Sequence, residues 1–194
     1  MKPTGGDDLT LKSWDARTLP SLSSPSGASP SPTTLTPTST NRRTFGGGVT
    51  SIQTSPHQPR KLAVGSYDST VRIFDTRNLM RPVCEAAVGG GAWRLKFHPS
   101  GVGGRARELL VGAMHAGCRV VRFGGGVLGG DDDGNGNAGE EWTIVTKFEK
   151  HESMAYGADW SYKHISSGGS GSGAGGTLVG SCSFYDHVLH LWRG

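Results

Sequence analysis

Ionisable and aromatic side chains recur next to the tight turns of a repeated pattern in this sequence. Asp7, Tyr67 and Tyr185 each stand directly before an aspartate that opens an alternating strand. His115 stands two residues before Gly117, which replaces the aspartate in another copy of the pattern. An imidazole titrates near neutral pH and can act as a general base, and a phenol can donate a hydrogen bond to a developing oxyanion. The residues before the turns are therefore the first candidates for catalysis or binding.

Further candidates lie in the predicted strand 155–160. We predict His115 as a general base, with Asp159 either orienting it or activating water directly. Tyr156 adds another hydroxyl donor. The alternative for His115 is a turn residue with satisfied hydrogen bonds. Arg94 is expected to be a structural ion-pair partner rather than an oxyanion donor.

These residues belong to a spacing that occurs four times along the chain. In three copies an aspartate is followed, six residues later, by an aromatic residue that closes an alternating strand: Asp8 with Trp14, Asp68 with Phe74, and Asp186 with Trp192. A fourth, degenerate copy runs from Gly117 to Phe123. A recurring spacing with period-2 alternation indicates a repeat architecture built from half-buried strands. This pattern is typical of WD repeats, which supply the four-stranded blades of a β-propeller.

The predicted fold is therefore all-β, an incomplete WD-repeat propeller of about three and a half blades. Residues 1–17 form a partial blade that begins at its third strand, 9–15. Residues 18–44, rich in Ser, Thr and Pro, are predicted to be a disordered insertion. Residues 45–194 form the remaining blades, with Gly-rich insertions at 124–141 and 166–176. The predicted strands are 49–54, 61–66, 70–75 and 83–87 in the second blade, 92–97, 108–114, 118–123 and 142–148 in the third, and 155–160, 177–183 and 188–192 in the fourth.

One histidine is predicted to be structural. His151 lies four residues before the first apolar position of an inner strand, Ala155. With Asp186 and Trp192 it would form a buried hydrogen-bond network that pins the blade, because a buried imidazole and a buried indole N–H both need partners. Asp8, Asp68 and Trp14 are assigned the same structural role in the other blades.

Composition and charge argue against several classes of function. The excess of 20 basic over 16 acidic residues is small and unclustered, so we expect no nucleic-acid partner. The three cysteines lack metal-ligand spacing, the acidic stretch at 131–136 lacks a flanking helical pattern, and we expect neither a metal nor a cofactor. No apolar stretch approaches the length of a membrane span or a leader, so no membrane partner is expected and the cytoplasm is predicted, with the nucleus as the alternative.

Several strings go beyond a generic WD repeat. They are Gly48-Val49-Thr50-Ser51-Ile52-Gln53-Thr54-Ser55-Pro56-His57, Gly65-Ser66-Tyr67-Asp68 with Asp75-Thr76-Arg77-Asn78, Gly91-Ala92-Trp93-Arg94-Leu95-Lys96-Phe97-His98-Pro99, Met114-His115-Ala116-Gly117, Tyr156-Gly157-Ala158-Asp159-Trp160-Ser161 and Cys182-Ser183-Phe184-Tyr185-Asp186-His187. Together the strings resemble the C-terminal half of the WD-repeat diphthine methylesterases of diphthamide synthesis, also called diphthine methyltransferases. The chain is expected to be that half or a truncated gene model of it, and pairing with another chain is the alternative route to closure.

The resemblance implies a seven-bladed propeller that acts as a carboxylic ester hydrolase. Its substrate would be the methyl ester of methylated diphthine on translation elongation factor 2, its partner, with other diphthamide-synthesis proteins as further partners. Trp93 and Trp160 would contact the trimethylammonium group by cation–π attraction, or else belong to the core between blades. The full set of predicted substrate contacts is Tyr67, Trp93, Tyr156, Trp160 and Tyr185. The alternative function is a non-catalytic WD-repeat adaptor, because the propeller fold itself implies no chemistry.

Overall fold

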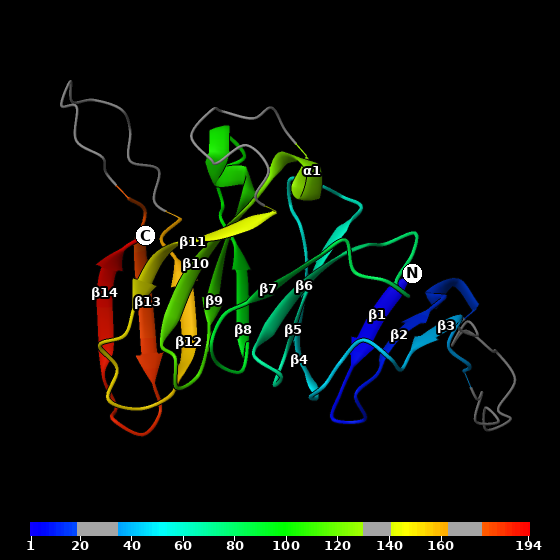
Figure 1. Ribbon diagram of the computed structural model, residues 1–194, viewed down its shortest axis with the longest axis horizontal. Coiled ribbons are helices and arrows are strands. Elements are labelled where there is room, and N and C mark those ends of the chain that lie inside the picture. The colour runs from blue at the N-terminus through cyan, green and yellow to red at the C-terminus, as the bar shows by residue number, and fades with distance from the viewer. Residues whose placement is uncertain (19–34, 130–140, 163–175) are drawn as a thin grey trace, which may run out of the picture.

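In the computed structural model, the described residues, 1–18, 35–129, 141–162 and 176–194, form four antiparallel sheets. The sheets stand side by side in chain order, from β1–β3 near the N-terminus to β12–β14 at the opposite end (Figure 1). Each sheet is a meander in which consecutive strands pair, the local topology of propeller blades. The predicted all-β section of about three and a half WD-type blades is confirmed.

The strands match the predicted spacing closely. The first sheet contains β1 (Lys2–Gly5), β2 (Leu11–Trp14) and β3 (Ser39–Asn41), and the second contains β4 (Val49–Thr54), β5 (Lys61–Ser66), β6 (Thr70–Asp75) and β7 (Cys84–Ala87). The third contains β8 (Arg94–Phe97), β9 (Glu108–Gly112), β10 (Cys118–Phe123) and β11 (Trp142–Phe148), and the fourth contains β12 (Ala155–Trp160), β13 (Leu178–Ser183) and β14 (Leu189–Arg193). Three short helical turns accompany them: η1 (Ala16–Thr18), η2 (Gly103–Arg107) and α1 (Gly125–Leu128).

The first blade begins earlier than predicted. β1 precedes β2 and pairs with it from Lys2 opposite Trp14 to Gly5 opposite Leu11, so the blade has a strand before its predicted first one. The residues of β1 are mostly exposed. Backbone pairing rather than a buried apolar face forms this strand, and hydrophobic alternation therefore does not reveal it.

The predicted insertion 18–44 also contains a strand. β3 is held by hydroxyl contacts from Ser13 Oγ to Thr38 Oγ1 (2.7 Å) and to Ser39 Oγ (2.8 Å), and by the buried Asn41, whose amide donates to the Leu79 carbonyl at 2.9 Å. Polar cross-strand contacts order this part of the Ser/Thr-rich segment without a large apolar area, which corrects the prediction of disorder up to residue 44. The rest of the segment, 19–34, lies outside the described residues.

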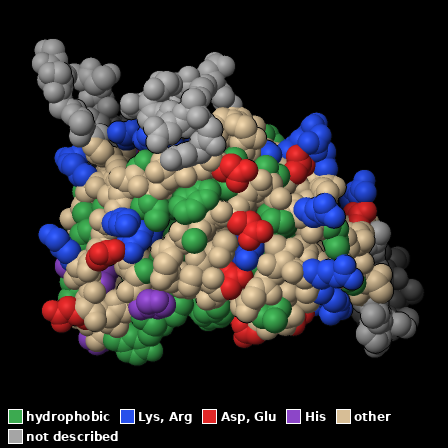
Figure 2. All heavy atoms as spheres, viewed as in Figure 1, with side chains coloured by type: hydrophobic (Ala, Val, Ile, Leu, Met, Phe, Trp, Pro, Cys, Tyr) green, Lys and Arg blue, Asp and Glu red, His purple; other side chains and the backbone are tan. Residues whose placement is uncertain are grey.

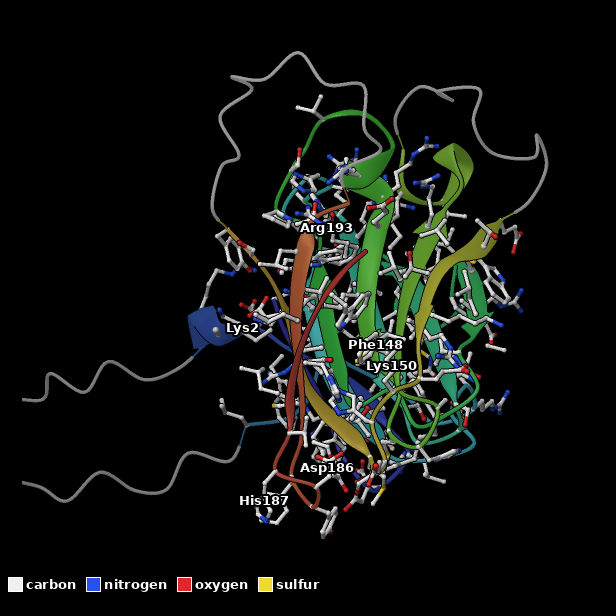
Figure 3. All side chains as sticks on the ribbon, turned by 90° about the vertical axis from the view of Figure 1, so that its left-hand side faces the viewer. Lys2, Phe148, Lys150, Asp186, His187 and Arg193 are labelled. Atoms are coloured by element: carbon white, nitrogen blue, oxygen red, sulfur yellow. The ribbon has the colours of Figure 1, made fainter. Side chains whose placement is uncertain are left out.

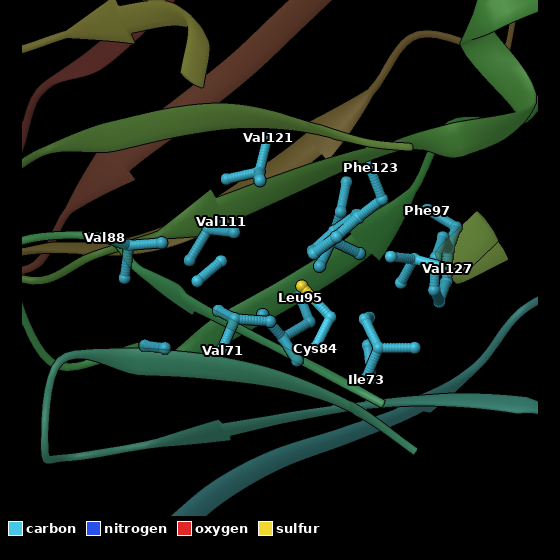
Figure 4. Packing of buried hydrophobic residues seen from close by; sticks show 14 of the residues in the cluster. Val71, Ile73, Cys84, Val88, Leu95, Phe97, Val111, Val121, Phe123 and Val127 are labelled. Carbon is cyan, nitrogen blue, oxygen red and sulfur yellow. The ribbon is translucent and has the colours of Figure 1, made fainter. Parts of the chain in front are cut away.

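The two Gly-rich insertions are described only in part, since 130–140 and 163–175 lie outside the described residues. The start of the first insertion folds into α1, whose Val127 and Leu128 are buried in the main core. That core lies between the second and third sheets, where Ile73 and Cys84 of one sheet face Leu95 and its neighbours on the other (Figure 4). Each fully buried aliphatic side chain contributes about 1.5–3 kcal/mol, so this interface fixes the two blades relative to each other.

The last blade contains a hydrogen-bond network around His151 and Trp192, but a serine rather than Asp186 lies at its centre. Ser181 Oγ accepts the Trp192 indole N–H at 3.0 Å and lies 2.9 Å from His151 Nε2. Asp186 is farther away, 3.9 Å from His151 Nδ1, and that nitrogen has no hydrogen-bond partner among the described residues. The serine hydroxyl therefore joins the imidazole to the indole, a link that the sequence prediction did not contain.

The other turn aspartates are satisfied by different partners. Asp8 accepts hydrogen bonds from Thr10 and pairs with Lys12, while Asp68 pairs with Arg72 at 2.9 Å. In the first blade the Trp14 indole donates to Thr4 Oγ1 at 2.8 Å, as Trp192 does to a hydroxyl in the last. The repeat therefore keeps its turn geometry while the supporting contacts change from blade to blade.

None of the helices in the described part of the chain has the length and apolar character needed to cross a membrane.

Candidate functional site

The turns between the second and third strands of the blades lie at one face of the molecule. The β1–β2 and β13–β14 turns both stand at the lower edge of Figure 1. The backbone joins neighbouring blades along this face, because Ala92 N–H donates to the Ser66 carbonyl and Ala155 N–H donates to the Met114 carbonyl, each at 3.0 Å. Side chains from three blades therefore meet here, and we call this face the turn face.

Four aromatic rings form a continuous row across the turn face. Tyr67 lies 5.8 Å from Trp93 between ring centroids, Trp93 lies 5.5 Å from Tyr156, and Tyr156 lies 6.3 Å from Tyr185. The interplanar angles of 49°, 78° and 52° tilt each ring against its neighbour rather than stacking them flat. Four of the five predicted substrate contacts are thus brought together, and we call these four residues the aromatic row.

The aromatic row is open to solvent. Tyr67 is 43% exposed, Trp93 38% and Tyr185 61%, although large aromatic side chains usually bury most of their surface. Phe184, 70% exposed, continues the row beyond Tyr185 with ring centroids 5.3 Å apart. Figure 2 shows apolar side chains at the lower edge of the molecule near the β13–β14 turn, close to histidine side chains. Exposed rings in contact with one another are suited to binding a ligand or partner.

Within the row, Tyr156 is held in its protonated form. Loss of solvent and the neighbouring Tyr185 and Tyr67 raise the pKa of the Tyr156 hydroxyl above its ordinary value. The hydroxyl also lies 3.6 Å from the Met154 sulfur, a weak acceptor. At neutral pH Tyr156 is therefore a hydrogen-bond donor and not a phenolate nucleophile.

His115 lies in the β9–β10 turn and is exposed. The turn is closed by hydrogen bonds from Ala116 N–H to the Ala113 carbonyl (2.9 Å) and from Gly117 N–H to the Met114 carbonyl (3.0 Å). The imidazole itself makes no hydrogen bond with any described residue. The structure therefore does not show the alternative, a His115 ring with hydrogen-bond partners inside its own turn. Its ring nitrogens are available to a ligand.

Asp159 is not brought near His115. It lies four residues beyond Ala155, which pairs with Met114 at the turn face, so at about 3.3 Å per residue it stands roughly 13 Å further along β12. Its carboxylate forms an ion pair with Lys96 at 2.8 Å. Orientation of His115 by Asp159 is therefore excluded by geometry, and activation of water by Asp159 remains a prediction for a different part of the fourth blade.

Trp160 belongs to the core between blades. It is 3% exposed, its indole donates to the Lys96 carbonyl at 2.9 Å, and its ring packs edge-on against His98 at 4.7 Å. The predicted substrate contact of Trp160 is thus corrected to the core alternative. Trp160 lies on the buried face of β12 with Ala158, and the register irregularity between Ala155 and Gly157 takes Tyr156 out of this alternation, which leaves it at the turn face.

Arg94 has a different environment from the one expected. It is exposed at the start of β8, next to Trp93, and forms no ion pair with any described residue. The expected structural ion pair is therefore absent from the described part of the chain. An unpaired guanidinium beside the aromatic row can instead donate to a carbonyl or carboxylate oxygen.

Met114 and Phe184 also adjoin the row, although no role for either residue is predicted from the sequence. A methyl group added at Gly91 would lie 2.6 Å from the Met114 sulfur and 3.4 Å from Tyr67 Cδ1, so the glycine lets these two side chains pack over the backbone. Phe184 is visible in the sequence as an aromatic residue in a turn, a position where apolar side chains are seldom buried.

Other reactive groups lie away from the turn face or are buried. Burial, with Glu141 as a second cause, raises the pKa of the Cys84 thiol to about 12, and burial raises that of Cys118 to about 11. Both thiols stay protonated at neutral pH and are poor nucleophiles. Within the described ranges, no group of three or more His, Cys, Asp or Glu side chains is placed to hold a metal ion.

Comparison with known proteins connects this arrangement to one family. The chain is 36% identical to the mouse protein named diphthine methyltransferase over 159 residues, which is 82% of this chain and 27% of that protein. It is 32% identical over 191 residues to the diphthine methyltransferase homolog of Dictyostelium discoideum, 97% of this chain and 45% of that protein. It is also 29% identical over 211 residues to the diphthine methyltransferase of Saccharomyces cerevisiae, with 97% and 44% covered. The chain spans less than half the length of each of these relatives.

Solved structures agree on the fold. A chain in the crystal structure of the mitotic checkpoint complex superimposes with a TM-score of 0.66 at 14% identity, covering 99% of this chain and 45% of that one. At that identity the match shows the fold alone. No family model matches the sequence. Over the part of their length that it covers, the chain is therefore related to the diphthine methyltransferases, which confirms the resemblance found in its sequence.

Proposed function

We propose that this chain contributes to diphthamide biosynthesis by forming part of an enzyme that hydrolyses the methyl ester of methylated diphthine on translation elongation factor 2. Similarity to the diphthine methyltransferases supports the pathway. The observation that carries the reaction site is the aromatic row, which spans three blades at the turn face and is open to solvent.

The aromatic row suits the trimethylammonium group of the proposed substrate. A quaternary ammonium cannot donate a hydrogen bond, so a site recognises it through ring faces and negative charge. Trp93 lies between Tyr67 and Tyr156 at 5.8 and 5.5 Å, and each of the three rings is tilted against the next. Such contacts contribute roughly 0.5–1 kcal/mol each at exposed sites, which is enough to orient a side chain presented by a large protein partner.

The hydrolytic step needs a base and oxyanion donors beside the bound cation. Water attacks the ester carbonyl carbon, the bond to the methoxy oxygen breaks, and the products are methanol and a carboxylic acid that loses its proton to solvent to give the carboxylate. His115 is the proposed acceptor of the water proton and returns it to the departing methoxy oxygen. The Tyr156 hydroxyl, kept protonated by its surroundings, and the Arg94 guanidinium are the proposed donors to the tetrahedral oxyanion.

The experiment is incubation of the chain with elongation factor 2 that carries methylated diphthine. Intact-mass analysis is expected to show the loss of one methyl group, and an equal amount of methanol should be released. In ¹⁸O-labelled water, the label should appear in the new carboxylate. A His115→Gln variant should lose most of this activity. Methyl loss without methanol, or no methyl loss from a chain that binds the factor, contradicts the proposal.

The exposed apolar side chains of the last blade favour a second candidate, a non-catalytic adaptor. Phe184, Leu189 and Leu191 are each at least 66% exposed, and such surfaces commonly bind proteins. In that case the chain would bind elongation factor 2 regardless of methylation, and Trp93→Leu would weaken binding to the methylated and unmethylated forms equally.

A further inference from the structure

A carboxylate without a partner stands beside the end of the aromatic row. Asp7, in the β1–β2 turn, is exposed and forms no hydrogen bond or ion pair with any described residue. Its neighbour Asp8 is different, because it accepts from Thr10 at 2.8 Å and pairs with Lys12 at 2.5 Å. Asp8 therefore stabilises the turn, whereas the carboxylate of Asp7 is available to interact with a ligand.

A glycine holds Asp7 against the row. A methyl group added at Gly48 would lie 2.7 Å from Asp7 Oδ1 and 3.3 Å from Tyr67 Cδ2. The Asp7 carboxylate and the Tyr67 ring therefore both adjoin the position that a side chain at residue 48 would fill, and the absence of a side chain there lets them approach each other. Val49 N–H, donating to the Gly6 carbonyl at 3.0 Å, fixes the β1–β2 turn against this glycine.

We propose that Asp7, Tyr67 and Trp93 form a binding site for a quaternary ammonium group, and that Asp7 makes this site select a cationic ester over its zwitterionic hydrolysis product. The proposal rests on the proposed function for the identity of the cation. It goes further because it assigns a first-blade residue to substrate selection and predicts that the hydrolysis product binds more weakly than the ester.

The selection follows from charge. A trimethylammonium ester carries one positive charge, and hydrolysis adds a carboxylate that brings its net charge to zero. Asp7 attracts the first and repels the new carboxylate of the second, while the rings of Tyr67 and Trp93 attract the ammonium group of both. The aromatic rings therefore supply affinity and the carboxylate supplies the difference between substrate and product.

Three small probes separate these contributions. They are the methyl ester of glycine betaine, glycine betaine itself, and the neutral analogue of the ester in which a tert-butyl carbon replaces the quaternary nitrogen. Binding to the 194-residue chain is followed by tryptophan fluorescence at constant ionic strength, since exposed charge pairs are screened by salt. The wild-type chain is expected to bind the cationic ester most tightly.

Asp7→Asn is expected to weaken binding of the cationic ester roughly two- to fivefold and to leave the neutral analogue unchanged, the range for an exposed charge pair. Gly48→Ala should produce the same loss, because its methyl group displaces the carboxylate. Tyr67→Leu should weaken the binding of the betaine ester and of betaine to the same extent. Asp75→Asn is the matched control: it also removes one negative charge, from an exposed pair with Arg77 outside the turn face.

An unchanged preference for the ester over betaine in Asp7→Asn, with an unchanged melting temperature, overturns the proposal. Equal weakening by Asp75→Asn overturns it as well, because the effect would then be one of net charge. The probes test the cation site without catalysis. Selective binding by a chain that fails to hydrolyse methylated diphthine would leave this site standing and reject the proposed reaction.

Discussion

At the scale of single residues, the turn face contains side chains whose interactions are left open. Arg94 and Asp7 have no ion pair, and the His115 ring has no hydrogen bond, among the described residues. Comparable charged groups elsewhere are paired, such as Asp68 with Arg72 at 2.9 Å. Unpaired polar groups gathered around an exposed aromatic row are suited to binding a charged ligand, since they lose no internal partner when the ligand arrives.

The Tyr156 hydroxyl provides a direct test of the proposed oxyanion donors. Tyr156→Phe removes the hydroxyl and keeps the ring of the aromatic row. If that hydroxyl donates to the tetrahedral intermediate, kcat should fall about 10²-fold with little change in KM, because the contact forms only in the transition state. Steady-state kinetics with methylated elongation factor 2 measure this.

Tyr162→Phe is the matched control for that variant. Tyr162 is 66% exposed at the end of β12, where its hydroxyl lies 3.5 Å from Asp159, away from the turn face. Its kinetics should match those of the wild type. A Tyr156→Phe variant with an unchanged kcat would remove Tyr156 from the list of donors.

At the scale of elements, the last blade depends on one hydroxyl. Ser181 on β13 joins Trp192 on β14 to His151 in the loop before β12, and Phe148 of the preceding blade stacks on Trp192 with ring centroids 4.9 Å apart. The network connects three elements of the last blade to the edge strand of the third. The stability of the β12–β14 sheet should therefore be sensitive to this site.

Ser181→Ala is expected to lower the free energy of unfolding by about 1–3 kcal/mol, because two partly buried hydrogen-bonding groups, on His151 and Trp192, lose their partner at once. Urea unfolding followed by tryptophan fluorescence measures the change. Ser51→Ala on β4 is the control: Ser51 makes no hydrogen bond through its side chain with any described residue, and its effect should stay within about 0.5 kcal/mol. Equal losses for both variants would show that Ser181 is not the centre of a network.

The network around His151 also makes the stability of the molecule depend on pH. Burial, followed by the nearby His190, lowers the pKa of His151 below its ordinary 6.5, although Asp186 opposes the shift. The unfolded chain then binds the proton more readily, so stability is fully present above about pH 6.5 and falls as the pH drops through 6.5 toward the lowered value. Burial lowers the pKa of His98 as well, with the same sign.

The melting temperature should therefore fall between about pH 7.5 and pH 5.5, and the fall should be smaller in His151→Gln. The glutamine keeps a donor for Ser181 but does not titrate. A melting temperature that is flat over this interval, or a fall of equal size in the variant, would exclude His151 as a contributor.

At the scale of the whole molecule, one side of the assembly of blades exposes an apolar sheet face. β14 pairs only with β13 in the described part of the chain, and Figure 3 looks onto this side, with Arg193 at one end of the strand and Asp186 at the other. Leu189 and Leu191 are 66% and 67% exposed on the outward face. A free strand edge with apolar neighbours is a surface prone to association.

Leu191→Lys should therefore reduce concentration-dependent association of the chain, with a change in unfolding free energy of at most about 0.5 kcal/mol. Sedimentation velocity over a range of protein concentrations measures the association. Val102→Lys provides the comparison, because Val102 is 79% exposed but lies in the loop before η2 and not on β14. Association reduced equally by both substitutions would point to net charge rather than to this face.

The sequence by itself determined the repeat and hence the blades. The spacing from Asp68 to Phe74 and from Asp186 to Trp192 fixes a turn and the strand after it, both of which are local features. Alternation then predicts the strand boundaries to within a few residues, because side chains on opposite faces of a sheet meet opposite environments. Hydrophobic alternation does not predict β1 and β3, because these strands are held by backbone pairing and hydroxyl contacts rather than by burial.

Only the tertiary structure decided which candidates share a site. The residues of the aromatic row are separated by tens of positions in the chain but lie on one face, because each stands next to a turn or the start of an inner strand. His115 and Asp159 are closer to one another in the chain than Tyr67 and Tyr156, and yet β12 carries the aspartate away from the turn face to Lys96. Packing between blades, which no local pattern contains, placed Trp160 in the core and left Trp93 exposed.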